Sequence, residues 1–132
     1  MKAKSETAIM RDCMVMLLEE SKSLSGHLRV VNFETVDQSR VLSFSKKAKG
    51  IHMELIEAFN PSEGRSRILQ RFFVQWNNML FGVFHVEQAL LSFGMLTESQ
   101  FDILRDALEE IISNLEKNPV MTRLRVAMDE KN

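Results

Sequence analysis

Histidine, asparagine and glycine residues recur at helical spacing in the middle of the chain, where they could form a pocket or a protein interface. The small and polar residues of this stretch follow one another in steps of three and four, which places them on one side of a helix. They are Gln75, Asn78, Gly82, His85, Ala89 and Ser92. Small side chains allow another helix or a ligand to approach closely, so this stripe is a candidate binding surface.

Three phenylalanines, Phe73, Phe81 and Phe84, flank this stripe. Exposing all three on a monomer would be unusual, so we expect the helix to be covered on nearly every side, by its own bundle or by a second copy. The structural alternative is a solvated face, or an internal position whose polar groups are satisfied. The candidate pocket or interface residues are Trp76, Asn78, Phe81, Gly82, Phe84 and His85.

His85 and His52 are the histidines to consider as ligands of a metal ion or haem. Carboxylate-bridged metal sites in helical bundles place a glutamate three residues before the histidine. Those positions hold Gly82 and Lys49 here. His85 could in principle serve as an axial haem ligand, but a lone histidine beside apolar residues is more often structural. We therefore predict no metal ion and no cofactor.

The residue pattern offers no candidate for nucleophilic or acid–base catalysis. The serines lack a neighbouring histidine or the glycine elbow that exposes a nucleophile. The adjacent carboxylates Glu19 and Glu20 point in different directions on a helix, so they do not form a working pair. We predict that the chain is not an enzyme.

Basic residues outnumber acidic ones between Arg40 and Arg71. If the two helices around position 60 form an antiparallel hairpin, Lys49 is expected near Arg71. The chain as a whole has a net charge of −1 and no recognition-helix motif, so it lacks the strong features of a nucleic-acid-binding protein. The candidate anion contacts are Lys46, Lys47, Lys49, Arg65, Arg67 and Arg71.

A long helix must position the central residues. Its apolar residues recur in steps of three and four, as one buried side of a helix requires. They are Leu69, Phe72, Trp76, Met79, Val83, Val86, Leu90 and Phe93. Asn60 and Pro61 are typical of a helix start, and Gly94 is typical of a helix end. We predict one continuous helix between these residues.

Capping patterns mark the starts of the helices on either side. Thr35 with Gln38, and Thr97 with Gln100, both fit a capping box, in which the two side chains satisfy each other's backbone N–H groups. Apolar residues at helical spacing follow each pair. We therefore predict one helix after Thr35 and another after Thr97.

The ends of the chain complete the predicted helices. The first helix is expected from about Glu6 to Ser23, with a break at residues 25–26, which are serine and glycine. Residues 27–36 are expected to form a connector packed on the bundle, because a lone strand there would have no pairing partner. A short terminal helix is expected to begin at Asn118–Pro119.

The predicted fold class is all-α, a single-domain up-and-down helical bundle over residues 1–132 with four main helices plus a short C-terminal helix. Short connections make consecutive helices antiparallel neighbours. With only five glycines and two prolines, the chain is poor in the turn residues that β-sandwiches and doubly wound folds need.

A cytoplasmic location is expected. Cys13 is the only cysteine, which excludes an intrachain disulfide and gives no sign of an oxidising compartment. Its apolar neighbours indicate a thiol packed in the core. No apolar run is long enough to cross a membrane, and no leader peptide is expected.

The residue pattern supports three hypotheses about function. The first is a non-enzymatic protein–protein interaction or regulatory module that self-associates, with a dimer favoured, through the long central helix. The second is a binder of a small molecule or cofactor with a phenylalanine-rich pocket in the bundle. The third is nucleic-acid binding through the basic residues. Because helical bundles serve many functions, the fold alone does not choose among them.

Overall fold

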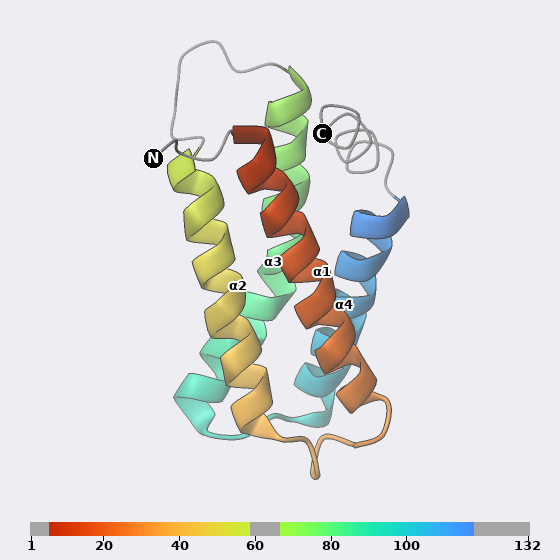
Figure 1. Ribbon diagram of the computed structural model, residues 1–132. Helices are drawn as coiled ribbons and strands as arrows, with labels where there is room; N and C mark the ends of the chain where they lie inside the picture. The colour runs from red at the N-terminus through yellow and green to blue at the C-terminus, as the bar shows by residue number, and fades with distance from the viewer. Residues whose placement is uncertain (1–5, 59–66, 118–132) are drawn as a thin grey trace.

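The structure is a computed structural model that describes residues 6–58 and 67–117, and these ranges form four α-helices. The helices are α1 (Glu6–Leu28), α2 (Gln38–Ala58), α3 (Arg67–Phe93) and α4 (Glu98–Lys117). Figure 1 shows that successive helices run in opposite directions. The predicted all-α up-and-down bundle is therefore confirmed. The predicted terminal helix from Asn118 and the predicted helix start at Asn60–Pro61 lie outside the described residues.

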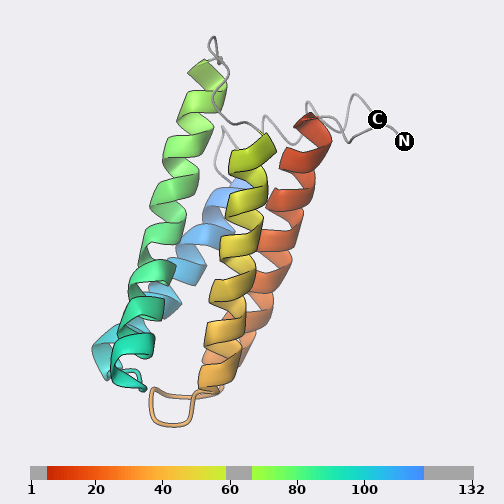
Figure 2. The ribbon, with the colours of Figure 1, turned by 90° about the vertical axis from the view of Figure 1, so that its left-hand side faces the viewer.

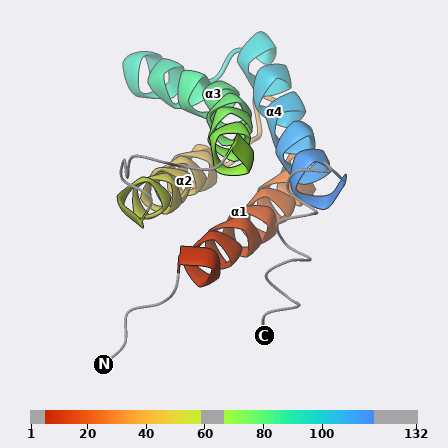
Figure 3. The same ribbon diagram turned by 90° about the horizontal axis from the view of Figure 1, so that it is seen from above.

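The four helices form a closed ring in which each packs against two others. α1 contacts α2 and α4, and α3 contacts α4 and α2. The view from above shows this arrangement around a shared centre (Figure 3). α2 and α3 run side by side (Figure 2) but share the least contact of the four pairs. The seam between α2 and α3 is therefore the least closely packed of the four.

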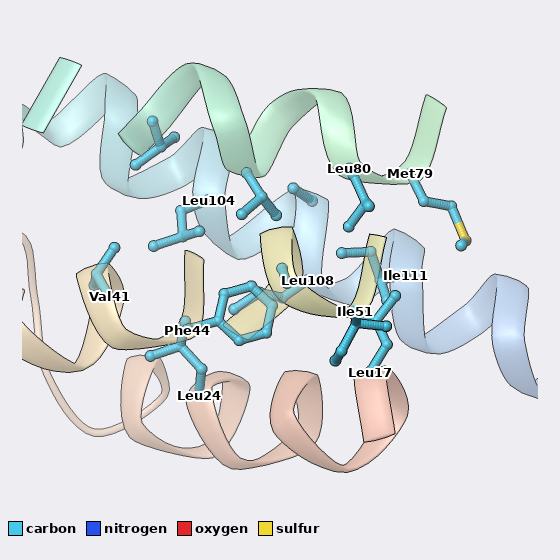
Figure 4. Close-up of a cluster of buried hydrophobic side chains, with 14 of the residues drawn as sticks. Leu17, Leu24, Val41, Phe44, Ile51, Met79, Leu80, Leu104, Leu108 and Ile111 are labelled. Carbon is cyan, nitrogen blue, oxygen red and sulfur yellow. The ribbon is translucent and has the colours of Figure 1, made fainter. Parts of the chain in front are cut away.

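Apolar side chains from all four helices meet in one core, as Figure 4 shows. Each large apolar side chain that is fully buried stabilises the fold by about 1.5–3 kcal/mol. This common core is what holds the helices in fixed positions. The labelled members of the cluster are Leu17, Leu24, Val41, Phe44, Ile51, Met79, Leu80, Leu104, Leu108 and Ile111.

The predicted apolar side of α3 is buried over most of its described length. Trp76, Met79, Val83, Val86 and Leu90 are all buried, as their spacing indicated. Phe93 is the exception, because its side chain is 75% exposed. It is the last residue of α3, at the edge of the buried side, and the chain turns away immediately after it. The end of the helix therefore leaves Phe93 uncovered.

The predicted signals at the α3–α4 junction are confirmed. Gly94 has a positive φ of 75°, which glycine adopts without strain, and its N–H donates to the Leu90 carbonyl over 2.8 Å. The Thr97 N–H donates to Gln100 Oε1 over 3.0 Å, and the Gln100 N–H donates to Thr97 Oγ1 over 3.2 Å. These two bonds form the capping box at the start of α4.

The cap of α2 differs from the prediction, because Asp37 and not Thr35 provides it. Asp37 Oδ1 accepts hydrogen bonds from the Ser39 N–H over 3.0 Å and from the Ser39 hydroxyl over 2.6 Å. The hydrogen bond from Ser39 lowers the pKa of Asp37. Thr35 instead bonds to Asn32 inside the connector. A carboxylate next to the first helical residue is a better acceptor for the free N–H groups than a hydroxyl farther away.

α1 continues past the predicted break and ends at Leu28. A glycine inside a helix costs about 1 kcal/mol relative to alanine. Extending the helix through Gly26 keeps Leu24 and Leu28 buried in the core, and burying each of them stabilises the fold by about 1.5–3 kcal/mol. The gain from burial therefore exceeds the cost of the glycine. Residues 29–37 then form the predicted connector, which contains no strand.

Candidate functional site

The outward side of α3 is an exposed surface without formal charge. We call it the α3 face. None of its residues is Asp, Glu, Lys or Arg. In the sequence between Arg71 and Glu98 the only residue of these types is Glu87, and its side chain is buried. The α3 face consists of the exposed residues Val74, Asn77, Asn78, Phe81, His85, Gln88, Leu91 and Ser92.

Phe81 is the most prominent side chain of the α3 face. It is 74% exposed, and Val74, one heptad earlier on the same side of the helix, is exposed as well. Exposed phenylalanine loses the hydrophobic stabilisation that burial would provide, and exposed apolar side chains that lie together on one surface commonly mark an interaction site. α3 was expected to be covered on nearly every side, either by its own bundle or by a second copy. Its own bundle leaves this side exposed, and cover by a second copy stays a prediction.

A hollow of about 390 Å³ lies at the α2–α3 seam beside Phe81. Apolar side chains form much of its wall, and amide and imidazole groups stand among them. Phe81 borders the hollow and at the same time projects into solvent from it. The lining residues are His52, Asn77, Leu80, Phe81, Phe84, His85 and Gln88.

A hydrogen bond between α2 and α3 sets the protonation state of His52. The fully buried Trp76 donates its indole N–H to His52 Nδ1 over 3.1 Å. Since Nδ1 must carry a lone pair to accept this bond, the imidazole is neutral and its proton is on Nε2. Burial lowers the pKa of His52 in the same direction. His52 also meets the Phe84 ring edge-on, with the ring centroids 6.3 Å apart.

A buried carboxylate makes the second polar link across this seam. Glu87 of α3 accepts hydrogen bonds from the Ser45 hydroxyl and the Lys49 ammonium group, both on α2. Burial acts to raise the pKa of Glu87, but the bonds from Lys49 and Ser45 and the charge of Lys49 together lower it. Lys49 Nζ also lies 5.9 Å from the centre of the Phe84 ring. These contacts hold Phe84 in place at the edge of the hollow.

Gly82, a predicted interface residue, faces α4 rather than solvent or a second copy. A Cβ atom added to it would lie 3.0 Å from Cβ of Ala107. Ala89, on the same stripe, is buried. The small residues therefore let α3 and α4 approach closely within one chain. The sequence had left open that the stripe occupies an internal position in the bundle, and this is what the structure shows for Gly82 and Ala89.

The other predicted pocket residues are separated by the fold. Phe81, Phe84 and His85 line the hollow together. Trp76 lies in the core and reaches the hollow only through its bond to His52, and Asn78 belongs to the α3 face outside the hollow. The hollow is a surface feature of the α2–α3 seam and not a cavity within the bundle. His52, Asn77, Leu80 and Gln88 were not predicted as pocket residues. His52 was considered only as a metal or haem ligand, because the sequence does not show that its helix places it beside Phe81 and Phe84.

The predicted basic cluster is divided among different partners. Lys47 pairs with Glu20 of α1 over 3.3 Å, and Lys49 pairs with Glu87. Lys49 therefore lies beside Glu87, which is 16 residues, or more than four helical turns, along α3 from Arg71, and not beside Arg71 as expected. Lys46 and Arg71 are exposed. Arg65 lies outside the described residues, as does the side chain of Arg67.

The structure also bears on metal binding and on membrane insertion. In the part of the chain that it describes, no group of three or more His, Cys, Asp or Glu side chains is placed to hold a metal ion. Within the same ranges no helix has the length and apolar character needed to cross a membrane.

No protein-family model matches the chain, and no curated protein or solved structure is significantly similar to it. Function must therefore be inferred from the chemistry of the α3 face and the hollow.

Proposed function

We propose that this protein is a non-enzymatic interaction module that binds another protein through the α3 face. The observation that carries the proposal is the exposed Phe81 in a surface without formal charge, next to a hollow of about 390 Å³. The centres of protein interfaces are depleted of charged residues and enriched in aromatic ones. A few aromatic side chains that enter pockets commonly supply most of the binding energy. Phe81 and the hollow match this description.

The chemistry of the hollow favours binding over catalysis. Its lining residues include no carboxylate, hydroxyl or thiol that could act as a nucleophile or a general acid. Of its two imidazoles, that of His52 already uses Nδ1 to accept the bond from Trp76. We also infer a cytoplasmic location for this binding, because the chain has a single cysteine, Cys13, whose thiol is buried in the core, and this suits a reducing compartment.

Site-specific photocrosslinking in the native cells tests the proposal. A photoreactive amino acid replaces Gln88, which is exposed on the α3 face and lines the hollow. The matched control carries it at Val30, which is 80% exposed in the connector. We expect a protein adduct from position 88 and none from position 30, and we expect Phe81→Asp to abolish the adduct. Equal adducts at both positions, or none from position 88, would overturn the proposal.

The Phe81→Asp variant is a suitable probe because Phe81 contributes little to the core. Its side chain is 74% exposed, so replacing it leaves the buried cluster intact. Surface substitutions away from caps and cores change stability by roughly 0.5 kcal/mol or less. At low protein concentration the variant should therefore unfold at nearly the same temperature as the unmodified chain, and loss of an adduct can be assigned to the surface itself.

A further inference from the structure

The α3 face contains both a projecting side chain and a hollow, which is what a symmetric interface requires. In a two-fold interface both partners use the same surface. A side chain that projects from this surface must therefore fit a hollow in the same surface of the second copy. Phe81 projects directly beside the hollow that Leu80, Phe84 and His52 help to form. A second copy rotated by 180° can therefore place its Phe81 in this hollow and receive Phe81 in return.

The charges at the ends of α3 favour an antiparallel arrangement of the two copies. Arg71 is exposed before the first residue of the α3 face, and Glu98, the exposed first residue of α4, follows the end of α3 by five residues. Parallel α3 helices would bring like charges together at both ends. Antiparallel helices bring each Arg71 near Glu98 of the second copy, twice per dimer, and the uncharged middle needs no complementary charge.

We infer that the partner bound by the α3 face is a second copy of this chain, joined antiparallel about a two-fold axis so that Phe81 of each copy fills the hollow of the other. This inference rests on the proposed function and names the partner that the same surface binds. The site is incomplete in one chain, because Phe81 borders the hollow without filling it and stays 74% exposed.

A charge-exchange experiment tests the arrangement directly. Arg71 and the last residue of α3, Phe93, are 22 residues apart, which is about 33 Å along the helix, and Glu98 follows Phe93, so the two charges cannot compensate each other within one chain. Sedimentation equilibrium measures the dimer dissociation constant of Arg71→Glu, Glu98→Arg and the double variant. We expect each single reversal to weaken the dimer by about two- to thirtyfold, the range expected for two exposed ion pairs. The double variant should recover the original constant.

Phe81→Asp tests the central contact in the same measurement. A carboxylate would enter an apolar hollow, so we expect the dimer to weaken by about thirtyfold or more, as for an interface hot spot. Val30→Asp places the same charge on an exposed apolar position of the connector and should leave the constant unchanged. A dimer that tolerates Phe81→Asp, or a double charge variant no better than the single ones, would overturn the inference.

Native mass spectrometry of protein that has never been unfolded shows whether a second copy, a small molecule or neither is bound to the chain. A complex of two 15.3 kDa chains supports the inference. A monomer at every concentration, or a monomer that retains a small molecule, overturns it. If a monomeric chain still gives adducts with a different protein from position 88, only this inference fails. If it gives no adduct at all, the proposed function fails as well.

Discussion

At the scale of single residues, the hydrogen bond from Trp76 connects the core of the bundle to the candidate site. The indole is fully buried and needs an acceptor, and His52 Nδ1 provides it across the α2–α3 seam. A buried N–H without a partner costs roughly 1–3 kcal/mol. Both the stability of the seam and the hydrogen-bonding character of the hollow therefore depend on a neutral His52.

The protonation of His52 should make the free energy of unfolding depend on pH. The folded-state pKa of His52 is lowered from 6.5 by burial, so the unfolded chain binds the proton more readily. The stability that neutral His52 contributes is complete above pH 6.5, and it is lost as the pH falls through the lower folded-state pKa. We expect the free energy of unfolding, measured in urea, to fall over this interval, together with a change in Trp76 fluorescence.

His52→Asn provides the control, because its amide oxygen can stand near the position of Nδ1 and accept the same bond without titrating. The other two histidines, His27 and His85, remain in both proteins. The difference between the two pH profiles therefore isolates His52. Profiles with the same slope would contradict the assignment of a neutral acceptor at this position.

At the scale of helices, the small residues of α3 determine how closely it packs on α4. Gly82 leaves 3.0 Å between the position of an added Cβ and Cβ of Ala107, which is shorter than an ordinary van der Waals contact. Both atoms are attached directly to helix backbones, so neither can move aside alone. A larger residue at position 82 must separate the two helices or distort one of them.

We expect Gly82→Leu to destabilise the fold by about 1–3 kcal/mol, the usual cost of overpacking. Gly50→Ala is the matched control, because Gly50 is exposed on α2 and an added Cβ there meets no atom within 4 Å. This change should stabilise the helix by about 0.5–1 kcal/mol. Urea unfolding measures both values. A neutral Gly82→Leu variant would show that α3 and α4 are not closely packed at this point.

Helix ends show where local sequence is sufficient and where it is not. The capping box of α4 and the glycine end of α3 were predicted correctly because each depends on residues within one turn of the helix. The end of α1 was predicted too early, because burial of Leu28 against the rest of the core outweighs the local preference of Gly26. Long-range packing decides such cases.

At the scale of the whole molecule, the seam between α2 and α3 combines the least contact of the four helix pairs with two polar links that are buried or partly buried. Ser45, Lys49 and Glu87 form one link there, and His52 with Trp76 forms the other. The ion pairs that join α1 to its two neighbours, Lys47 with Glu20 and Lys22 with Glu116, are exposed instead. A second chain placed over this seam would exclude water from both links, and so association and folding stability should be coupled.

This coupling predicts a thermal midpoint that depends on protein concentration. A dimer that binds only folded chains shifts the unfolding equilibrium by mass action. We expect the midpoint, followed by circular dichroism, to rise by several degrees over a hundredfold increase in concentration. Phe81→Asp should remove this dependence while leaving the low-concentration midpoint unchanged. A midpoint independent of concentration in the unmodified chain would contradict the coupling.

The sequence by itself determined the class of fold, the central helix and part of the site. Helical periodicity is a local property, and it identified the buried side of α3 and named Phe81, Phe84 and His85 as candidates. Only the tertiary structure decided that Gly82 packs on α4, that Lys49 pairs with Glu87, and that His52 of another helix completes the hollow. The physical reason is that periodicity shows which residues share a side of a helix. Which neighbour covers that side depends on how all four helices pack together.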